Sequence, residues 1–262
     1  MLEKLHIASA TELCAASVTC GGRTFTPDED NAYIAFRLSH SLPSMTVFRG
    51  GLHPATVAAS WGTIVNKQFN FMHKSERGLG TILAAEFPDA PAGGWKIPAQ
   101  AADAPGIRAV AVIHRKAPGA AAMIQLHADG EVAWEVSMEV EHQVDSGAFA
   151  LPREGGWDFI ACADAPAELR ACLKPREGGG GRACSGLFEG VEPVLLWGGV
   201  PGLAGCAGKV RYIGTALCYR GAEPTNAVDQ ITASDEAVAP AGLAGFMRDA
   251  AAVLRSRARR GL

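Results

Sequence analysis

The stretch EVAWEVSMEVEH, residues 131–142, decides the fold class, because apolar and polar residues alternate through almost all of it. Successive side chains of a β-strand point to opposite faces, so a period of two predicts a strand. The side chains on the packed face would be Val132, Trp134, Val136, Met138 and Val140. Ser137 would then lie on the face opposite the packed one.

Other stretches extend this strand into a sheet. The sequence predicts strands at NAYIAFR (31–37), QFNFMH (68–73), TILAAEF (81–87), IRAVAVIH (107–114) and VRYIGTALCY (210–219), all rich in β-branched, aromatic or small apolar residues. Gly78 and Gly80 bracket a turn that would make strand 81–87 the antiparallel partner of strand 68–73.

Helices are predicted at the periphery. Pro54 suits the first turn of a helix over 53–65, and Asp129-Gly130 would end a helix over 120–127. An Ala-rich helix over 241–260 ends in several arginines. The fold class is therefore mainly β with peripheral helices (α+β), an antiparallel β-barrel. The barrel domain would span 1–235, with an irregular elaboration at about 152–208, and a C-terminal basic helix or tail would span 236–262.

Composition excludes several classes of partner. The formal net charge of the 262 residues is -3 and no stretch of the main body is basic, so we expect no nucleic acid. The apolar runs are too short to span a bilayer, and the first residues do not resemble a signal peptide, so we expect a cytoplasmic protein without a membrane partner. The seven cysteines never form a Cys-x-x-Cys pair; we expect buried reduced thiols, no metal and no cofactor.

Two residues are candidates for nucleophilic catalysis. A catalytic serine needs a base within hydrogen-bond reach, usually histidine. Ser137 in the middle of one strand and His73 at the end of another, 137 − 73 = 64 residues apart, would lie on adjacent strands of the barrel. No Gly-x-Ser-x-Gly motif occurs, which disfavours an α/β-hydrolase. Taken alone, each residue is more often a plain surface residue than a catalytic one.

The order of short motifs along the chain further supports His73 and Ser137 as the candidate pair. An Asn-x-x-His segment ends a strand at Asn70-Phe71-Met72-His73, and Leu79-Gly80-Thr81-Ile82 begins the next strand. A helix that closes on Gly130 leads to Val136-Ser137-Met138, and a late strand runs into a turn of small residues over 215–227. This order resembles the prohead (capsid-maturation) serine proteases of tailed phages, which share a fold with the herpesvirus assemblins. The resemblance covers roughly residues 30–235.

The resemblance implies a function and partners. It implies an assemblin-like barrel and a Ser-His endopeptidase that cleaves scaffold and capsid proteins, and itself, during maturation of the prohead. Capsid and scaffold proteins would be its peptide substrates, and it would work inside the prohead in the host cytoplasm. A homo-oligomer is left open.

The third catalytic member departs from the family pattern. The family takes an acid, or in assemblins a second histidine, from the late strand, but Tyr212-Ile213-Gly214-Thr215 offers neither. Glu139 shares the face of Ser137 and is slightly favoured to orient His73. Glu141, His142 and Asp145 remain alternatives, as does a dyad without a third member.

Two other functions compete with the protease. A capsid-assembly protein that keeps the fold without the chemistry would explain the missing late-strand acid. An unrelated small-molecule hydrolase would need a deep apolar cavity at the site. His114 could reach the same pocket, although a structural histidine is the commoner case. For the oxyanion, Gly155-Gly156 and Gly198-Gly199 are both open.

Overall fold

We describe a computed structural model of the chain, which covers residues 17–38, 49–98, 103–132, 134–175, 182–218 and 228–233. The strands in chain order are β1 (Val18–Cys20), β2 (Arg23–Phe25), β3 (Asn31–Leu38), β4 (Gly50–Gly51), β5 (Gln68–Phe71), β6 (Lys74–Glu86), β7 (Ile107–His114), β8 (Glu135–Glu141), β9 (Ala148–Arg153), β10 (Gly156–Ala161), β11 (Leu173–Pro175), β12 (Arg182–Cys184), β13 (Val194–Leu196), β14 (Arg211–Cys218) and β15 (Val228–Thr232). The helices are α1 (Pro54–Ala58), α2 (Ala120–Ala128) and α3 (Ala167–Arg170), with short 3₁₀ helices η2 (Trp61–Ile64) and η4 (Val144–Ser146).

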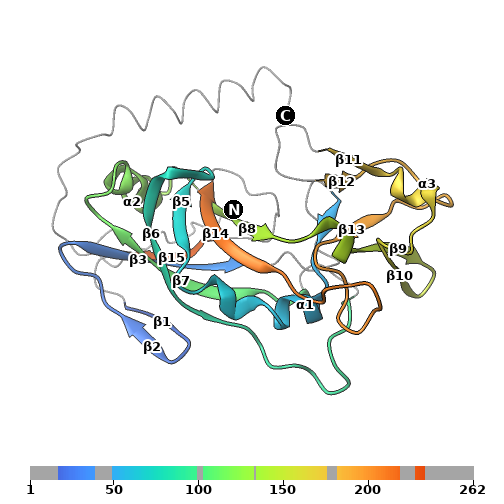
Figure 1. The fold of residues 1–262 in the computed structure, drawn as a ribbon. Helices are drawn as coiled ribbons and strands as arrows, with labels where there is room; N and C mark the ends of the chain where they lie inside the picture. The colour runs from blue at the N-terminus through green and yellow to red at the C-terminus, as the bar shows by residue number, and fades with distance from the viewer. Residues whose placement is uncertain are drawn as a thin grey trace, which may run out of the picture.

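The protein is mainly β, and its largest sheet is a curled half-barrel. Seven strands follow the order β15-β3-β7-β6-β5-β14-β8. Figure 1 shows the curl of this sheet, with α2 at one end. The Val228 amide at the start of β15 donates to the Trp134 carbonyl just before β8, at 3.3 Å. This hydrogen bond connects the start of β15 with the residue before β8, and β15 and β8 are the two outer strands of the sheet.

The strong curl has local causes. β-Bulges occur within the β5–β6 and β6–β7 pairs, and bulges bend a strand and increase its twist. Gly80 of β6 lies so close to β7 that a Cβ there would overlap the Val112 carbonyl. The sequence motif around Gly80 is therefore explained by the close approach of two strands.

The core lies on one face of the curled sheet. Phe69 and Phe71 of β5, Leu217 of β14 and Val136 of β8 belong to one cluster of buried residues. Phe36 and Phe69 stack with ring centroids 5.4 Å apart. The opposite face of β5, β14 and β8 carries the polar residues of the candidate site.

A smaller sheet adjoins the curled one. It has the order β10-β9-β13-β4 and lies to the right in Figure 1. Residues 152–208 supply part of it, and they also form α3 and the β11–β12 pair. Parts of the segment expected to be irregular thus form short strands and a helix, because short apolar runs such as Val194–Leu196 pair with neighbouring strands.

Most predicted elements exist, with shifted ends. β7 matches its predicted bounds, and β3, β14 and α2 match within one residue. The helix predicted over 53–65 is instead α1 followed by η2. The turn predicted between Gly78 and Gly80 lies at 72–73, so β6 begins at Lys74. The basic helix predicted over 241–260 and the small-residue turn after 218 fall outside the described residues.

The sheet is not wholly antiparallel. β14 pairs with β5 in parallel, and β13 pairs with β4 in parallel. A late strand that inserts between two earlier ones leaves no trace in hydrophobic periodicity, because both pairings have a period of two. This insertion sets the geometry of the candidate site.

Candidate active site

His73 lies at the tip of the β5–β6 hairpin. Phe71 pairs with Lys74, so Met72 and His73 alone form the turn. Both have positive φ, 56° for Met72 and 59° for His73, which a two-residue type I′ turn requires. Asn and Gly are the usual residues there, so a Met-His turn holds strain. Backbone strain of this kind is typical of functional sites.

The imidazole of His73 meets the carboxylate of Glu139. His73 Nδ1 lies 2.9 Å from Glu139 Oε1, with the two side chains 43% and 26% exposed. Asn70 Nδ2 donates to the same oxygen at 3.1 Å. The hydrogen bond from His73, together with that from Asn70, holds the pKa of Glu139 below its ordinary value of 4.5, against the opposing effect of burial. Glu139 is therefore an ionised acceptor, and such an acceptor favours the imidazole tautomer that carries its proton on Nδ1.

Strand β14 brings these side chains together although it lies between their strands. Gly214 pairs with Gln68 on one side and with Glu139 on the other. A Cβ on Gly214 would overlap Glu139 Oε2. The missing side chain thus provides the space in which a carboxylate from β8 reaches residues of β5 and its hairpin.

Ser137 lies on the same face, one row further along. Ala216 pairs with Asn70 on one side and with Ser137 on the other, which separates the Cα atoms of Asn70 and Ser137 by roughly 10 Å. Ser137 is two residues before Glu139 on β8, so their Cα atoms are about 7 Å apart. Ser137 is only 6% exposed. Within the described part of the chain its hydroxyl makes no hydrogen bond, and so none to His73.

Two expectations for Ser137 are wrong. Its strand β8 is not adjacent to β5, because β14 separates them. Its face is not open to solvent either, since Asn70, Ala216 and Cys218 on that face are buried as well. Alternation along one strand identifies which side chains share a face, but it does not report what covers that face.

The other candidates for the third member lie elsewhere. Glu141 forms an ion pair with Arg211, with 2.7 Å from Arg211 Nε to Glu141 Oε2. His142 stacks on Trp197, with ring centroids 5.9 Å apart, and Asp145 lies in η4. The carboxylate that contacts the imidazole is thus the one that the sequence slightly favoured.

Two further residues have no catalytic geometry. His114 Nδ1 lies 3.3 Å from Asn31 Oδ1 at the end of β7, as expected for a structural histidine. Cys218 shares the face of Ser137, but burial, together with Glu135 and Glu139, raises the pKa of its thiol to about 12. It stays protonated near neutral pH and is a poor nucleophile.

The glycine pairs considered for the oxyanion belong to the second sheet and its connections. Gly156 starts β10 and pairs with Arg153. The Gly199 amide donates to the Leu196 carbonyl at 3.1 Å, and the Gly198 carbonyl accepts from Gly208. Neither pair contacts Ser137, so the described residues do not assign an oxyanion hole.

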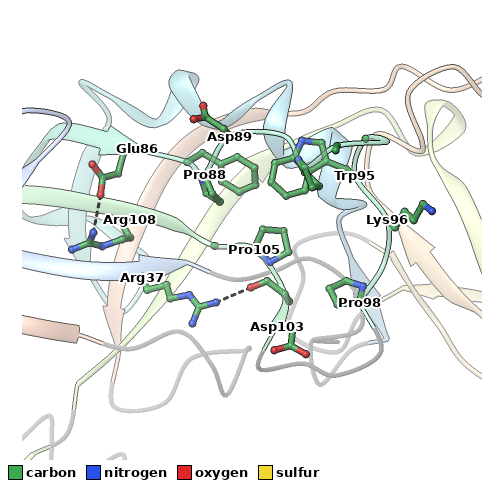
Figure 2. A pocket seen from close by; sticks show the side chains of 16 residues that line it. Arg37, Glu86, Pro88, Asp89, Trp95, Lys96, Pro98, Asp103, Pro105 and Arg108 are labelled. Atoms are coloured by element: carbon green, nitrogen blue, oxygen red, sulfur yellow. Dashed lines mark hydrogen bonds and ion pairs between the residues drawn. The ribbon is translucent and has the colours of Figure 1, made fainter.

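A cavity of about 960 Å³ lies away from this site. Figure 2 shows it between Trp95, Pro88, Pro98 and Pro105, with the Glu86–Arg108 ion pair at one side. Glu86 ends β6, whereas His73 lies just before its start. His73, Ser137 and Glu139 do not line this cavity. This cavity is therefore separate from the candidate site.

Sequence reasoning named three of the site residues and missed the functions of others. Asn70 was part of a motif without an assigned role, and Gly214 was noted only for being neither acid nor histidine. The signal available for Gly214 was a glycine inside a strand, which often marks a close approach. Nothing in one sequence could pair it with Glu139.

The comparisons with known proteins do not add a relative. No protein-family model, curated protein or solved structure matches the chain. Among the described residues no group of three or more His, Cys, Asp or Glu could hold a metal ion. None of the helices described is long and apolar enough to cross a membrane. The described cysteines are free, and all except Cys206 are buried.

Proposed function

We propose that the chain is a serine endopeptidase with Ser137 as nucleophile, His73 as base and Glu139 as the group that orients His73. The observation that carries the proposal is the 2.9 Å contact between His73 Nδ1 and Glu139 Oε1, on the strand face that also holds Ser137. An acid on Nδ1 leaves Nε2 as the basic atom, which is the arrangement that a Ser-His-acid site uses.

The reaction would proceed through an acyl-enzyme. Ser137 Oγ attacks the peptide carbonyl while its proton passes to His73 Nε2, and the proton then goes to the leaving amine as the C–N bond breaks. A water molecule, deprotonated by the same Nε2, hydrolyses the ester and restores the Ser137 hydroxyl. Glu139 stabilises the imidazolium at each stage.

This mechanism requires a movement. Ser137 is buried and not hydrogen-bonded to His73, so the hairpin tip or the cover over Ser137 must shift before attack. Catalytic hydrogen bonds are often long before substrate binds. His73 is 43% exposed at a hairpin tip, so movement of this turn is one way to bring its ring toward Ser137.

The proposed substrate is an extended polypeptide. His73 is 43% exposed at a hairpin tip, where an extended chain could meet it from solvent, whereas the buried Ser137 must first be uncovered. The resemblance to prohead proteases suggests scaffold and capsid proteins, and the chain itself, as substrates inside the immature shell.

A second candidate function is a non-enzymatic capsid-assembly protein. The observation that favours it is the missing hydrogen bond of Ser137 within the described residues, because a hydroxyl that stays out of reach of His73 has no base. This candidate predicts a stable protein without hydrolytic activity on any peptide.

The two functions differ in a peptide-cleavage assay. The chain is incubated with a pooled library of internally quenched peptides and is also followed for self-cleavage by mass spectrometry. The endopeptidase predicts cleavage that Ser137→Ala abolishes and that Ser185→Ala, a change at an exposed serine away from the site, leaves intact. Cleavage that survives Ser137→Ala, or no cleavage by the wild type, would sink the proposal.

A further inference from the structure

Asn70 is a buried polar residue with an unfavourable environment. The residue is 1% exposed. Its Nδ2 bonds Glu139, but its Oδ1 is buried and has no hydrogen-bond donor within the described part of the chain. A buried acceptor left without a partner destabilises a fold, whereas an apolar group of similar shape does not. Stability therefore does not explain an asparagine at this position.

The geometry around Glu139 provides an explanation. Asn70 Nδ2 and His73 Nδ1 both contact Oε1, at 3.1 and 2.9 Å. The space left by Gly214 receives Oε2. Two donors on one oxygen and a gap for the other restrict both the position and the plane of the carboxylate. Asn70 has no hydrogen bond to His73, so its influence on the imidazole passes through Glu139.

We propose that Asn70 is a positioning residue that holds the Glu139 carboxylate against Nδ1 of His73 and so selects the tautomer with a basic Nε2. This inference rests on the proposed function for its catalytic meaning, but its structural content is independent of turnover. The role differs from that of Glu139, because Asn70 carries no charge and does not touch the imidazole.

The test is Asn70→Leu, an apolar substitution of similar size. Without the Nδ2 donor, Glu139 loses one of its two hydrogen bonds, and the His73 proton is no longer confined to Nδ1. The ¹⁵N shifts of the imidazole, measured on histidine-labelled protein, should move from the Nδ1–H tautomer toward a mixture. With an active enzyme, kcat should fall roughly tenfold to a hundredfold, as for small misplacements of reacting groups, while KM stays near its wild-type value.

Stability separates positioning from a structural role. Because Oδ1 has no partner, Asn70→Leu should keep the melting temperature within about 4 °C of the wild type. Asn31→Leu, the same change at an amide that bonds Asp28, should leave the His73 shifts and kcat unchanged. Unfolding of Asn70→Leu, or unchanged His73 shifts in the folded variant, overturns the inference. A wild type without hydrolysis but with the predicted ¹⁵N response overturns the proposed function alone.

Discussion

At the scale of single residues, the site combines strain with scarce hydrogen bonds. His73 has a φ of 59°, in the left-handed region that disfavours residues with a Cβ. Its ring is nevertheless held by Glu139 from a strand two places away in the sheet. A turn chosen for stability alone would place Gly or Asn here, so the histidine is better explained by its contact than by its conformation.

A pair of substitutions isolates that strain. His73→Gly and His73→Ala both remove the imidazole, but only glycine accepts a positive φ without cost. We expect His73→Gly to be about 1 kcal/mol more stable than His73→Ala, because the two variants differ only in the Cβ at this position. Urea denaturation of the two proteins measures the difference. Equal stabilities would show that the hairpin tip relaxes to another conformation when the ring is absent.

At the scale of elements, α1 depends on an unusual capping residue. His53 is 6% exposed, and its Nδ1 accepts a hydrogen bond from the Ala55 amide at 3.1 Å. Its ring meets Phe159 edge-on, with centroids 5.5 Å apart. Burial lowers the pKa of His53 from 6.5 to about 4. The cap works only while Nδ1 is unprotonated. The stability of α1, and of its contact with Phe159 in the small sheet, should therefore depend on pH.

The sign of this link follows from the lowered pKa. The unfolded chain takes up a proton near pH 6.5, whereas the folded protein resists it until about pH 4. The contribution to stability is complete above pH 6.5 and is lost as pH falls toward 4, a change of roughly 3 kcal/mol at 1.36 kcal/mol per pKa unit.

We expect His53→Asn to weaken this acid sensitivity, because an asparagine caps a helix through a neutral oxygen. The measurement is the free energy of unfolding by urea at pH values from about 7.5 to about 4.5, which cover most of the interval between the unfolded and folded pKa values of His53. His127 and His142, whose pKa values burial also lowers, would leave a residual slope. His114→Gln, at the exposed end of β7, should keep the wild-type slope. A full slope in His53→Asn would contradict the account.

Strands and helices could be predicted where the hydrophobic periodicity was strong. Turns and strand ends that depend on pairing between strands could not. The apolar run 107–114 could be read as a central strand, and β7 has those bounds. The Met-His turn could not be found, because neither residue type favours positive φ and the glycines at 78 and 80 offered a better turn signal. Strand ends at such positions depend on tertiary contacts that override local preference.

At the scale of the whole molecule, the candidate site is assembled from residues far apart in the sequence, which only the order of strands in the folded sheet brings together. The hairpin tip and β8 supply His73 and Glu139, and the late strand β14 separates their strands. The pairing of Glu139 with His73 could be anticipated, since Glu139 shares a face with Ser137. The insertion of β14 and the space at Gly214 could not, because sequence periodicity fixes faces and leaves the order of strands undetermined.

This arrangement also explains why one face of the sheet is polar yet buried. Small residues on β14, Gly214 and Ala216, let side chains of β5 and β8 approach over it. Larger residues there would separate His73 from Glu139 even if every strand stayed in place. The proposed chemistry thus depends on residues that carry no reactive group.

The pairing of Ser137 with His73 can be tested by finding the position at which a fluorophosphonate labels the protein. A serine whose hydroxyl a histidine deprotonates attacks the phosphorus and displaces fluoride, which leaves a stable phosphonyl ester. We expect one label, on Ser137 by peptide mass spectrometry, with labelling lost in His73→Ala and strongly slowed in Glu139→Gln. A folded wild-type protein that remains unlabelled, or that is labelled at another serine, would contradict it.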